Sequence, residues 1–174
     1  CPLMRAEVAD SQKARGYIDK MEFAAKQLLS LINDLLEISR MERGKFSLDC
    51  KPMNLHQCIQ EYCDIFYALA QRENRNFDVC VEIQHEDVMG DSARLGQILN
   101  NLLSNAFKYT KNGGTISVHV QEQAGTYRFE IADDGVGMSK EFLAHVFEPY
   151  ARETRFTTRQ ATGTGLGMPI VRQL

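Results

Sequence analysis

The stretch Asn101-Leu102-Leu103-Ser104-Asn105-Ala106-Phe107-Lys108-Tyr109 decides the fold of this chain. Its apolar residues recur at helical spacing, which predicts an amphipathic helix. Asn101 and Asn105 are four residues apart and therefore project from one helix face, one turn apart. Side-chain amide oxygens are hard, neutral ligands suited to Mg²⁺, while Lys108 offers a cation to phosphate and Tyr109 a ring for stacking. Amides that only cap or solvate a helix are the alternative interpretation.

A carboxylate beside a glycine turn follows, Asp133-Asp134-Gly135-Val136-Gly137-Met138. Asp133 ends an apolar strand, so we expect a buried carboxylate there, which needs a hydrogen-bond donor. The exocyclic amine of adenine is a suitable donor. Gly135 and Gly137 allow a sharp turn and close approach to a flat base. A simple turn before a helix at Ser139 to His145 is the alternative.

A glycine ladder comes last, Gly163-Thr164-Gly165-Leu166-Gly167-Met168, directly before the apolar start of a helix. Backbone N–H groups and the positive end of the helix dipole favour a polyphosphate there. The ladder lacks the Gly-Lys-Ser/Thr of a P-loop and the leading strand of a dinucleotide site. The aperiodic stretch Ala151 to Thr162 before it is interpreted as a mobile lid, with a packed loop as the alternative. Three arginines flank that lid and are candidates for phosphate contact: Arg152, Arg155 and Arg159. For Arg155 and Arg159, positions in a solvated loop are an equal alternative.

The composition limits the classes of partner. The 174 residues have a net charge of -3 and no basic stripe, which argues against nucleic acid as the main partner. No run approaches the ~20 apolar residues that cross a bilayer. The five cysteines are odd in number and show no metal-binding spacing, so we expect reduced thiols and a cytoplasmic setting. The start at Cys1 predicts a fragment, whose parent can carry a membrane segment outside it.

The segment Gly16 to Met41 shows a heptad pattern. Ile18, Ala25 and Ile32 recur every seven residues, and Met21 and Leu28 occupy the second apolar position. Further leucines widen the stripe beyond a two-helix seam, which is typical of a bundle with more helices. We therefore expect partner helices from another chain or from missing sequence. Residues 1–15 are expected to form a ragged helix end and a loop, and the pattern after Gly44 becomes strand-like at residues 46–48.

The remaining sequence predicts an α+β fold. Asn54 is a plausible N-cap, and either Asp91 or Ser92 caps the helix that contains the amides. Phe77 to Ile83 alternate as a half-buried strand, and Thr115 to Val120 and Tyr127 to Ile131 flank Gly125 as a hairpin. Helices covering one face of a mixed or antiparallel sheet, a two-layer sandwich, follow from this order.

These motifs, in this order, resemble the ATP-binding catalytic domain of sensor histidine kinases, in the superfamily shared with gyrase and heat-shock chaperone ATPases. Asn101 to Tyr109 looks like the N box, Asp133 to Met138 like the first glycine box, Phe142 to Tyr150 like the F box, and Gly163 to Met168 like the second glycine box. Residues 28–46 resemble the second helix of the dimerisation domain and its exit. The resemblance implies a Bergerat-type fold over 45–174, truncated at its C-terminal end, after a partial dimerisation segment over 1–44.

The resemblance also implies roles for individual residues. Asn105, assisted by Asn101, would coordinate Mg²⁺, Lys108 and Arg152 would contact phosphate, and Phe147 would seat the lid. The adenine-facing and backbone positions complete the ATP-binding set: Tyr109, Asp133, Gly135, Gly137, Met138, Gly163, Thr164, Gly165, Leu166 and Gly167. The implied partners are a second copy, bound through the helix around 16–41, and a response-regulator receiver domain.

Two departures from the family pattern shape the functional prediction: the C-terminal truncation noted above and a missing histidine motif. The phosphoacceptor histidine motif of the family is absent, and His56, His85, His119 and His145 lie in the catalytic portion, so no catalytic residue is assigned. The γ-phosphoryl of ATP would pass to a histidine outside the fragment and then to a regulator aspartate. An ATP-hydrolysing machine is the main rival, but it carries a Glu where this chain has Asn101, and an amide cannot take a proton. A non-catalytic nucleotide-binding dimerisation module stays open.

Overall fold

The structure is a computed structural model that describes residues 2–43, 46–153 and 164–174. The chain divides into two compact units, Cys1–Gly44 and Lys45–Leu174. The first unit is the helix α1 (Pro2–Glu42), which ends two residues before Gly44, the point after which the sequence pattern changes. No helix in the described parts of the chain is both long and apolar enough to cross a bilayer.

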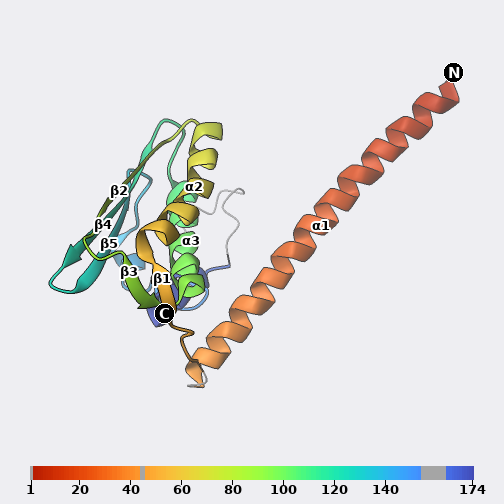
Figure 1. Cartoon of the computed structure of the whole chain (residues 1–174). Coiled ribbons are helices and arrows are strands. Elements are labelled where there is room, and N and C mark those ends of the chain that lie inside the picture. Colours follow the sequence, from red (N-terminus) through yellow and green to blue (C-terminus); the bar gives the residue numbers. More distant parts are fainter. Residues whose placement is uncertain (1, 44–45, 154–163) are drawn as a thin grey trace. The chain divides into compact units, whose positions relative to one another are not determined.

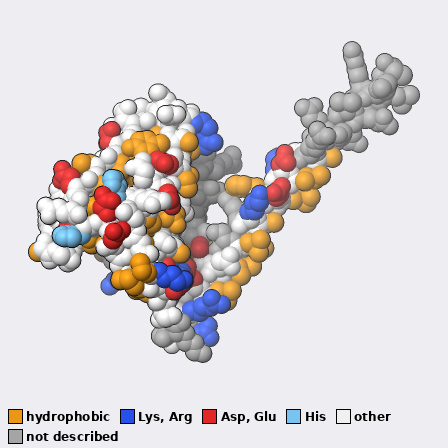
Figure 2. Space-filling model, viewed as in Figure 1, with side chains coloured by type: hydrophobic (Ala, Val, Ile, Leu, Met, Phe, Trp, Pro, Cys, Tyr) orange, Lys and Arg blue, Asp and Glu red, His pale blue; other side chains and the backbone are white. Residues whose placement is uncertain are grey.

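The expectation of a loop in residues 1–15 is wrong, because α1 is already helical from Pro2. Pro2 stands at the first helical position, where its missing N–H costs nothing. The residues after it are rich in Ala, Glu, Lys and Arg, which have high helix propensity, so a helix forms there without an apolar stripe. Figure 2 shows hydrophobic side chains gathered along the described part of this helix.

Five strands and four helices of the second unit are described among residues 46–153 and 164–174. The elements in chain order are β1 (Lys51–Asn54), α2 (Leu55–Arg72), β2 (Asn76–Glu82), β3 (Asp87–Gly90), α3 (Ser92–Tyr109), β4 (Thr115–Gln123), β5 (Thr126–Asp133), α4 (Lys140–Leu143) and α5 (Gly167–Gln173). The expected strand at residues 46–48 is absent from the described structure, because pairing begins only at Lys51, which lies opposite Gly90 of β3.

The main sheet has the order β2-β4-β5, and β1 and β3 form a separate antiparallel pair. β2 runs parallel to β4, and β4 and β5 form an antiparallel hairpin, so the sheet is mixed. Both hairpin tip residues have positive φ, 48° at Ala124 and 78° at Gly125, as a two-residue type I′ turn requires. The predicted hairpin around Gly125 is confirmed.

Helices α2 and α3 lie on one face of the main sheet, as the ribbon view makes plain (Figure 1). Their inward residues meet alternating residues of β2 and β4 in one core, with Ile59, Leu103, Ile116 and Val120 all 0% exposed. Asn54 caps α2 as predicted, because its Oδ1 accepts a hydrogen bond from the Gln57 N–H at 2.8 Å. The predicted α+β two-layer sandwich is confirmed.

Candidate nucleotide-binding site

Helix α3 carries the two predicted amides and is fixed at its N-terminus by Asp91. The Asp91 carboxylate accepts hydrogen bonds from the backbone N–H groups of Arg94 at 3.1 Å and Asp49 at 2.9 Å. The Asp49 bond is the main cause of the lowered pKa of Asp91, because an N–H donor stabilises the charged carboxylate. The buried face of α3 leaves Asn101 and Asn105 partly exposed on the helix.

The C-terminal end of α3 meets the first glycine turn. The Val136 N–H donates a hydrogen bond of 3.3 Å to the carbonyl oxygen of Tyr109. A Cβ atom at Gly135 would lie 2.6 Å from that same oxygen, which is closer than any real contact allows. Glycine is therefore required for the turn to lie against the helix end. Gly137, with a φ of +66°, also adopts a conformation that favours glycine.

The two carboxylates before this turn behave differently. Asp133 Oδ1 accepts a hydrogen bond of 2.9 Å from the Gly135 N–H, but the residue is exposed. The expectation of a buried Asp133 is thus wrong, because this residue ends an edge strand, where few neighbours surround its side chain. Asp134 instead binds the start of β4, since its Oδ1 accepts from the Thr115 N–H at 2.9 Å and its own N–H donates to Thr115 O at 3.1 Å.

The second glycine motif touches α3 from another side. A Cβ at Gly167 would lie 3.1 Å from Asn101 Oδ1, so this first residue of α5 faces the amide closely. Gly165 accepts a hydrogen bond of 2.9 Å from the Tyr150 N–H, and a Cβ on Gly165 would lie 2.8 Å from Tyr150 Cα. The end of the predicted F box and the glycine ladder are therefore in direct backbone contact.

The other candidate residues surround these contacts. The Lys108 ammonium lies 4.9 Å from the centre of the Tyr109 ring, in the last turn of α3. Thr164 Oγ1 accepts a hydrogen bond of 3.1 Å from the N–H of Leu166, which is itself buried. Met138 and Arg152 are exposed. Gly163 and the lid positions Arg155 and Arg159 lie outside the described residues.

Two segments far apart in the sequence thus contact α3. Asn101 meets Gly167, and Tyr109 meets the backbone of Gly135 and Val136. Asp133 binds the Gly135 N–H of the glycine turn, and this turn contacts the end of the helix that carries the two amides. Phe147 is 40% exposed, with the Arg172 guanidinium 5.7 Å from its ring centre, so its expected role toward the lid stays a prediction.

Glu153 is a positioning residue that sequence reasoning did not identify. Its carboxylate accepts hydrogen bonds from the Ser139 backbone N–H at 3.0 Å and from the Ser139 hydroxyl at 2.8 Å. The Ser139 hydroxyl also caps the short helix α4 by accepting from the Phe142 N–H. The segment after Tyr150 is thus attached to the exit of the first glycine turn. The sequence predicted only a helix beginning at Ser139, because nothing local links positions 139 and 153.

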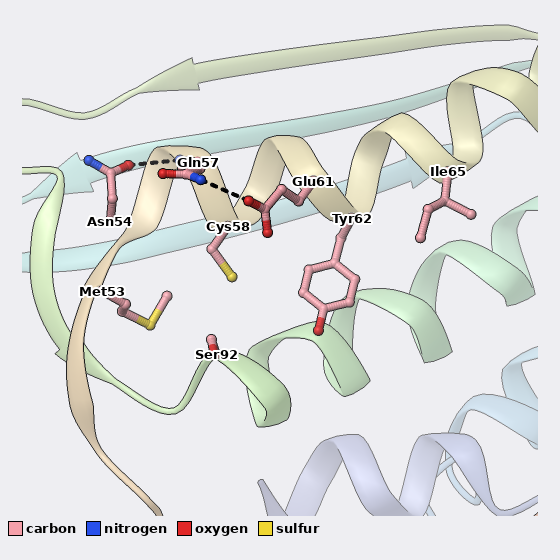
Figure 3. A pocket seen from close by; sticks show the side chains of 8 residues that line it. All are labelled: Met53, Asn54, Gln57, Cys58, Glu61, Tyr62, Ile65 and Ser92. Atoms are coloured by element: carbon pink, nitrogen blue, oxygen red, sulfur yellow. Dashed lines mark hydrogen bonds between the residues drawn. The ribbon is translucent and has the colours of Figure 1, made fainter.

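A separate open cavity of about 360 Å³ lies between α2 and the start of α3 (Figure 3). Tyr62 points from α2 toward α3, and the Gln57 amide donates to Glu61 at 2.8 Å on the same wall. Eight residues line the cavity: Met53, Asn54, Gln57, Cys58, Glu61, Tyr62, Ile65 and Ser92. None of them belongs to the candidate nucleotide-binding set, so this hollow is not the predicted ATP pocket.

Comparison with known proteins connects this arrangement to a family. Residues 90–174 match the model described as "Histidine kinase-, DNA gyrase B-, and HSP90-like ATPase". The autoinducer 2 sensor kinase/phosphatase LuxQ of Vibrio parahaemolyticus is 30% identical over 95% of this chain and 20% of its own length. The sensor histidine kinase GacS of Pseudomonas protegens is 32% identical over 99% of this chain and 19% of its own length. The chain spans about a fifth of the length of these curated relatives.

Solved structures show the same likeness. Full-length ShkA in complex with AMPPNP superposes with a TM-score of 0.77 at 26% identity, covering 91% of this chain and 33% of ShkA. The catalytic domain of the histidine kinase ThkA gives a TM-score of 0.61 at 26% identity, covering 72% of this chain and 78% of that domain. Residues 90–174, the segment that the family model matches, contain α3, both glycine motifs and the contacts between them. Residues 90–174 therefore belong to the histidine kinase-, DNA gyrase B- and HSP90-like ATPase family, and the chain has the fold of the ATP-binding catalytic domains of sensor histidine kinases.

Proposed function

We propose that this chain is the kinase segment of a two-component sensor histidine kinase. It would transfer the γ-phosphoryl group of ATP to a histidine nitrogen outside these 174 residues, for relay to an aspartate of a response regulator. The observation that carries the proposal is the convergence on α3, where Asn101 faces Gly167 and the Tyr109 carbonyl binds the Val136 N–H. The amides lie on α3, and both the glycine turn proposed for adenine and the glycine ladder proposed for the phosphates contact that helix.

The donor set of α3 fits a nucleotide with its metal ion. Asn105 and Asn101 would hold Mg²⁺ through amide oxygens, and bound Mg²⁺ neutralises charge on the phosphates. Lys108 and Arg152 would contact phosphate oxygens. Asp133 would accept a hydrogen bond from the adenine amine, which its exposure at the end of β5 allows.

The backbone positions would shape the two ends of the same pocket. Gly135, Gly137, Met138 and Tyr109 would line the adenine end, supported by the close approach of Gly135 to the Tyr109 carbonyl. Gly163, Thr164, Gly165, Leu166 and Gly167 would form the hinge of a lid over the phosphates. The hydrogen bond between Tyr150 and Gly165 supports a fixed hinge at its near end.

Asn101 favours phosphoryl transfer over hydrolysis. Activating a water molecule needs a base one helical turn before the metal-binding Asn105, and the Asn101 amide cannot accept a proton. A neutral imidazole is already nucleophilic, so a histidine acceptor needs positioning and charge neutralisation rather than a base from this domain. The contact of Asn101 with Gly167 supports an orienting role for the amide.

We propose that residues 1–44 are a partial dimerisation and phosphotransfer segment, and that 45–174 is the catalytic domain. The exposed apolar residues of α1 support a homodimer through the helix around 16–41, since Ile18, Met21 and Leu28 are each more than half exposed. A response-regulator receiver domain would be the second partner, as ThkA is solved in complex with the response regulator TrrA. The free thiols of Cys50, Cys58, Cys63 and Cys80 support a cytoplasmic setting.

Calorimetric titration with ATP, with and without Mg²⁺, tests the site. Asp133→Asn is expected to lower ATP affinity at least tenfold, while Glu130→Gln on the same strand leaves it unchanged. Asn105→Ala is expected to abolish the Mg²⁺ dependence, while Asn100→Ala on the same helix does not. Unchanged affinity in both site variants, with the circular dichroism of the parent, would remove the assignment.

The choice between kinase and ATPase needs an acceptor. The chain is incubated with labelled ATP and a separate helical segment that bears the phosphoacceptor histidine motif of the family. An acid-labile phosphoprotein is expected on that segment, with little free phosphate. Steady phosphate release without a phosphoprotein would favour the ATPase, and binding without either product would favour the non-catalytic module.

A further inference from the structure

The outer face of the main sheet carries a cluster of metal-ligating side chains away from the helices. Cys80 and Glu82 are two residues apart on β2 and therefore point to the same side. Their neighbours Val79 and Val81 pack toward the core, so this side is the one that α2 and α3 leave uncovered. His119 of β4 lies directly opposite Cys80 in the parallel register.

The donor atoms of these three residues lie close together. Cys80 Sγ, a Glu82 carboxylate oxygen and a His119 ring nitrogen are all within 4.8 Å of one another. His119 Nε2 and Glu82 Oε2 are 3.2 Å apart. A tetrahedral ion with bonds of 2.0–2.3 Å separates its ligands by about 3.4 Å, so modest side-chain rotation brings all three onto one ion.

His119 Nε2 faces two groups: the Glu82 carboxylate, an acceptor, and the Gln121 amide nitrogen, a donor, which lies 3.2 Å from Nε2 and also 3.4 Å from Glu82 Oε2. One nitrogen of a neutral imidazole satisfies only one of these neighbours at a time. A cation between Nε2 and the carboxylate would use the lone pairs of both.

From this geometry we propose that Cys80, Glu82 and His119 form a Zn²⁺ site on the outer face of the sheet. Thiolate, imidazole and carboxylate are the ligand types of zinc, and three protein ligands leave a fourth position for water. Mg²⁺ and Ca²⁺ do not fit, because they require a shell of oxygen ligands. The ion would cross-link the edge strand β2 to the central strand β4.

This site is separate from the proposed ATP site. None of its ligands belongs to the candidate nucleotide-binding set, and all three lie on the solvent side of β2 and β4. Because the unfolded chain has no such arrangement of ligands, Zn²⁺ would bind the folded state and raise its thermal midpoint as free Zn²⁺ increases.

Co²⁺ titration of the full, reduced, metal-free chain tests the proposal. We expect one Co²⁺ per chain with an intense thiolate charge-transfer band, displaced by one equivalent of Zn²⁺. Cys80→Ser and His119→Gln should each weaken binding at least tenfold and abolish or shift that band. Cys50→Ser removes another exposed thiol, and His85→Gln removes an exposed histidine paired to Glu122 at 2.6 Å, and both should bind like the parent.

The outcomes that overturn the proposal are equally defined. Binding without saturation, binding that survives Cys80→Ser, or a band lost in Cys50→Ser each contradict it. Restoration of the band on mixing Cys80→Ser chains with His119→Gln chains would contradict a site within one chain. Asp133→Asn should leave Co²⁺ binding unchanged, so the metal site and the ATP site succeed or fail independently.

Discussion

Helix α1 and helix α3 both carry an apolar stripe, but the stripe is exposed on α1 and buried on α3. In the second unit, Leu103 of α3 is 0% exposed, because it packs in one core with residues of α2 and the sheet. In α1, Leu28 is 58% exposed and Leu29 is 61% exposed. Amphipathic periodicity therefore specifies that a face will be buried, but not whether the same chain buries it.

The difference separates the part of the chain that buries its own core from the part that we propose to associate with a second copy. The second unit supplies its own core, so its folding free energy depends on contacts within residues 45–174. The exposed stripe of α1 would be stabilised by the proposed association, because an isolated helix with an uncovered apolar face is marginal in water.

The largest expected effect comes from truncating a buried leucine of α3, compared with truncating an exposed leucine of α1. Leu103→Ala should lower the unfolding free energy by about 2–5 kcal/mol, because it opens a cavity in the core. Leu28→Ala should change the unfolding of the second unit by less than about 0.5 kcal/mol. Urea titration followed by tyrosine fluorescence, suited to a chain without tryptophan, measures both.

The same pair of variants sharpens the comparison in solution. Sedimentation equilibrium of Leu28→Ala should show weaker self-association than the parent. If Leu28→Ala instead unfolds the second unit as strongly as Leu103→Ala does, the separation between the two regions is wrong.

The contact between α2 and α3 gives the next effect. A Cβ on Gly96 would lie 1.8 Å from Tyr62 Cζ, so Gly96→Ala must displace the Tyr62 ring. Such overpacking should cost about 1–3 kcal/mol in the urea titration. In a chain that already carries Tyr62→Ala the Gly96 substitution should cost much less, and an equal cost in both backgrounds would contradict the steric explanation.

Cys63 gives a pH-dependent effect confined to the second unit. Burial raises the pKa of this thiol to about 11 from an ordinary value of 9.0, with a smaller contribution from Asp64. Between these values the unfolded chain has lost the proton and the folded chain keeps it, so stability falls as pH rises, by at most about 1.4 kcal/mol per unit. Cys63→Ala should flatten the fall measured by urea titrations from pH 8.5 to 10.5, and an unchanged slope would contradict it.

The smallest expected effect concerns the start of α2. Asn54→Ala removes the oxygen that caps the Gln57 N–H and should cost about 1 kcal/mol. Asn54→Ser should recover most of that loss, since serine also caps. A serine variant as unstable as the alanine variant would show that the contact of the Asn54 amide with Glu86, at 3.1 Å, dominates instead.

Local signals predicted much of the fold. The Asn54 cap, the strand at Phe77, the hairpin at Gly125 and the amide helix all depend on neighbours in sequence, and each is present. The strand β3, Asp87–Gly90, was missed because it is short and only Val88 and Gly90 are partly buried. Its existence depends on pairing with β1, which no local pattern encodes.

The site was predictable in its residues but not in its contacts. The motifs named Asn101, Asp133 and Gly165, yet Asp134 is the carboxylate that binds β4, and the exposure of Asp133 depends on the edge position of β5. The Glu153–Ser139 bond joins residues whose separation carries no signal. Cys80 and His119 are likewise brought together only by the register of two parallel strands.

The hydrogen bond to the Tyr109 carbonyl has a consequence for insertions and deletions. One residue inserted between Asn105 and Tyr109 would rotate both amides by about 100° and shift them by about 1.5 Å relative to the glycine turn. The spacing from Asn101 to Val136 is therefore intolerant of length change within α3. The hairpin tip is the opposite case, since a Cβ on Gly125 would meet nothing within 4 Å, and length variation among homologues should accumulate there.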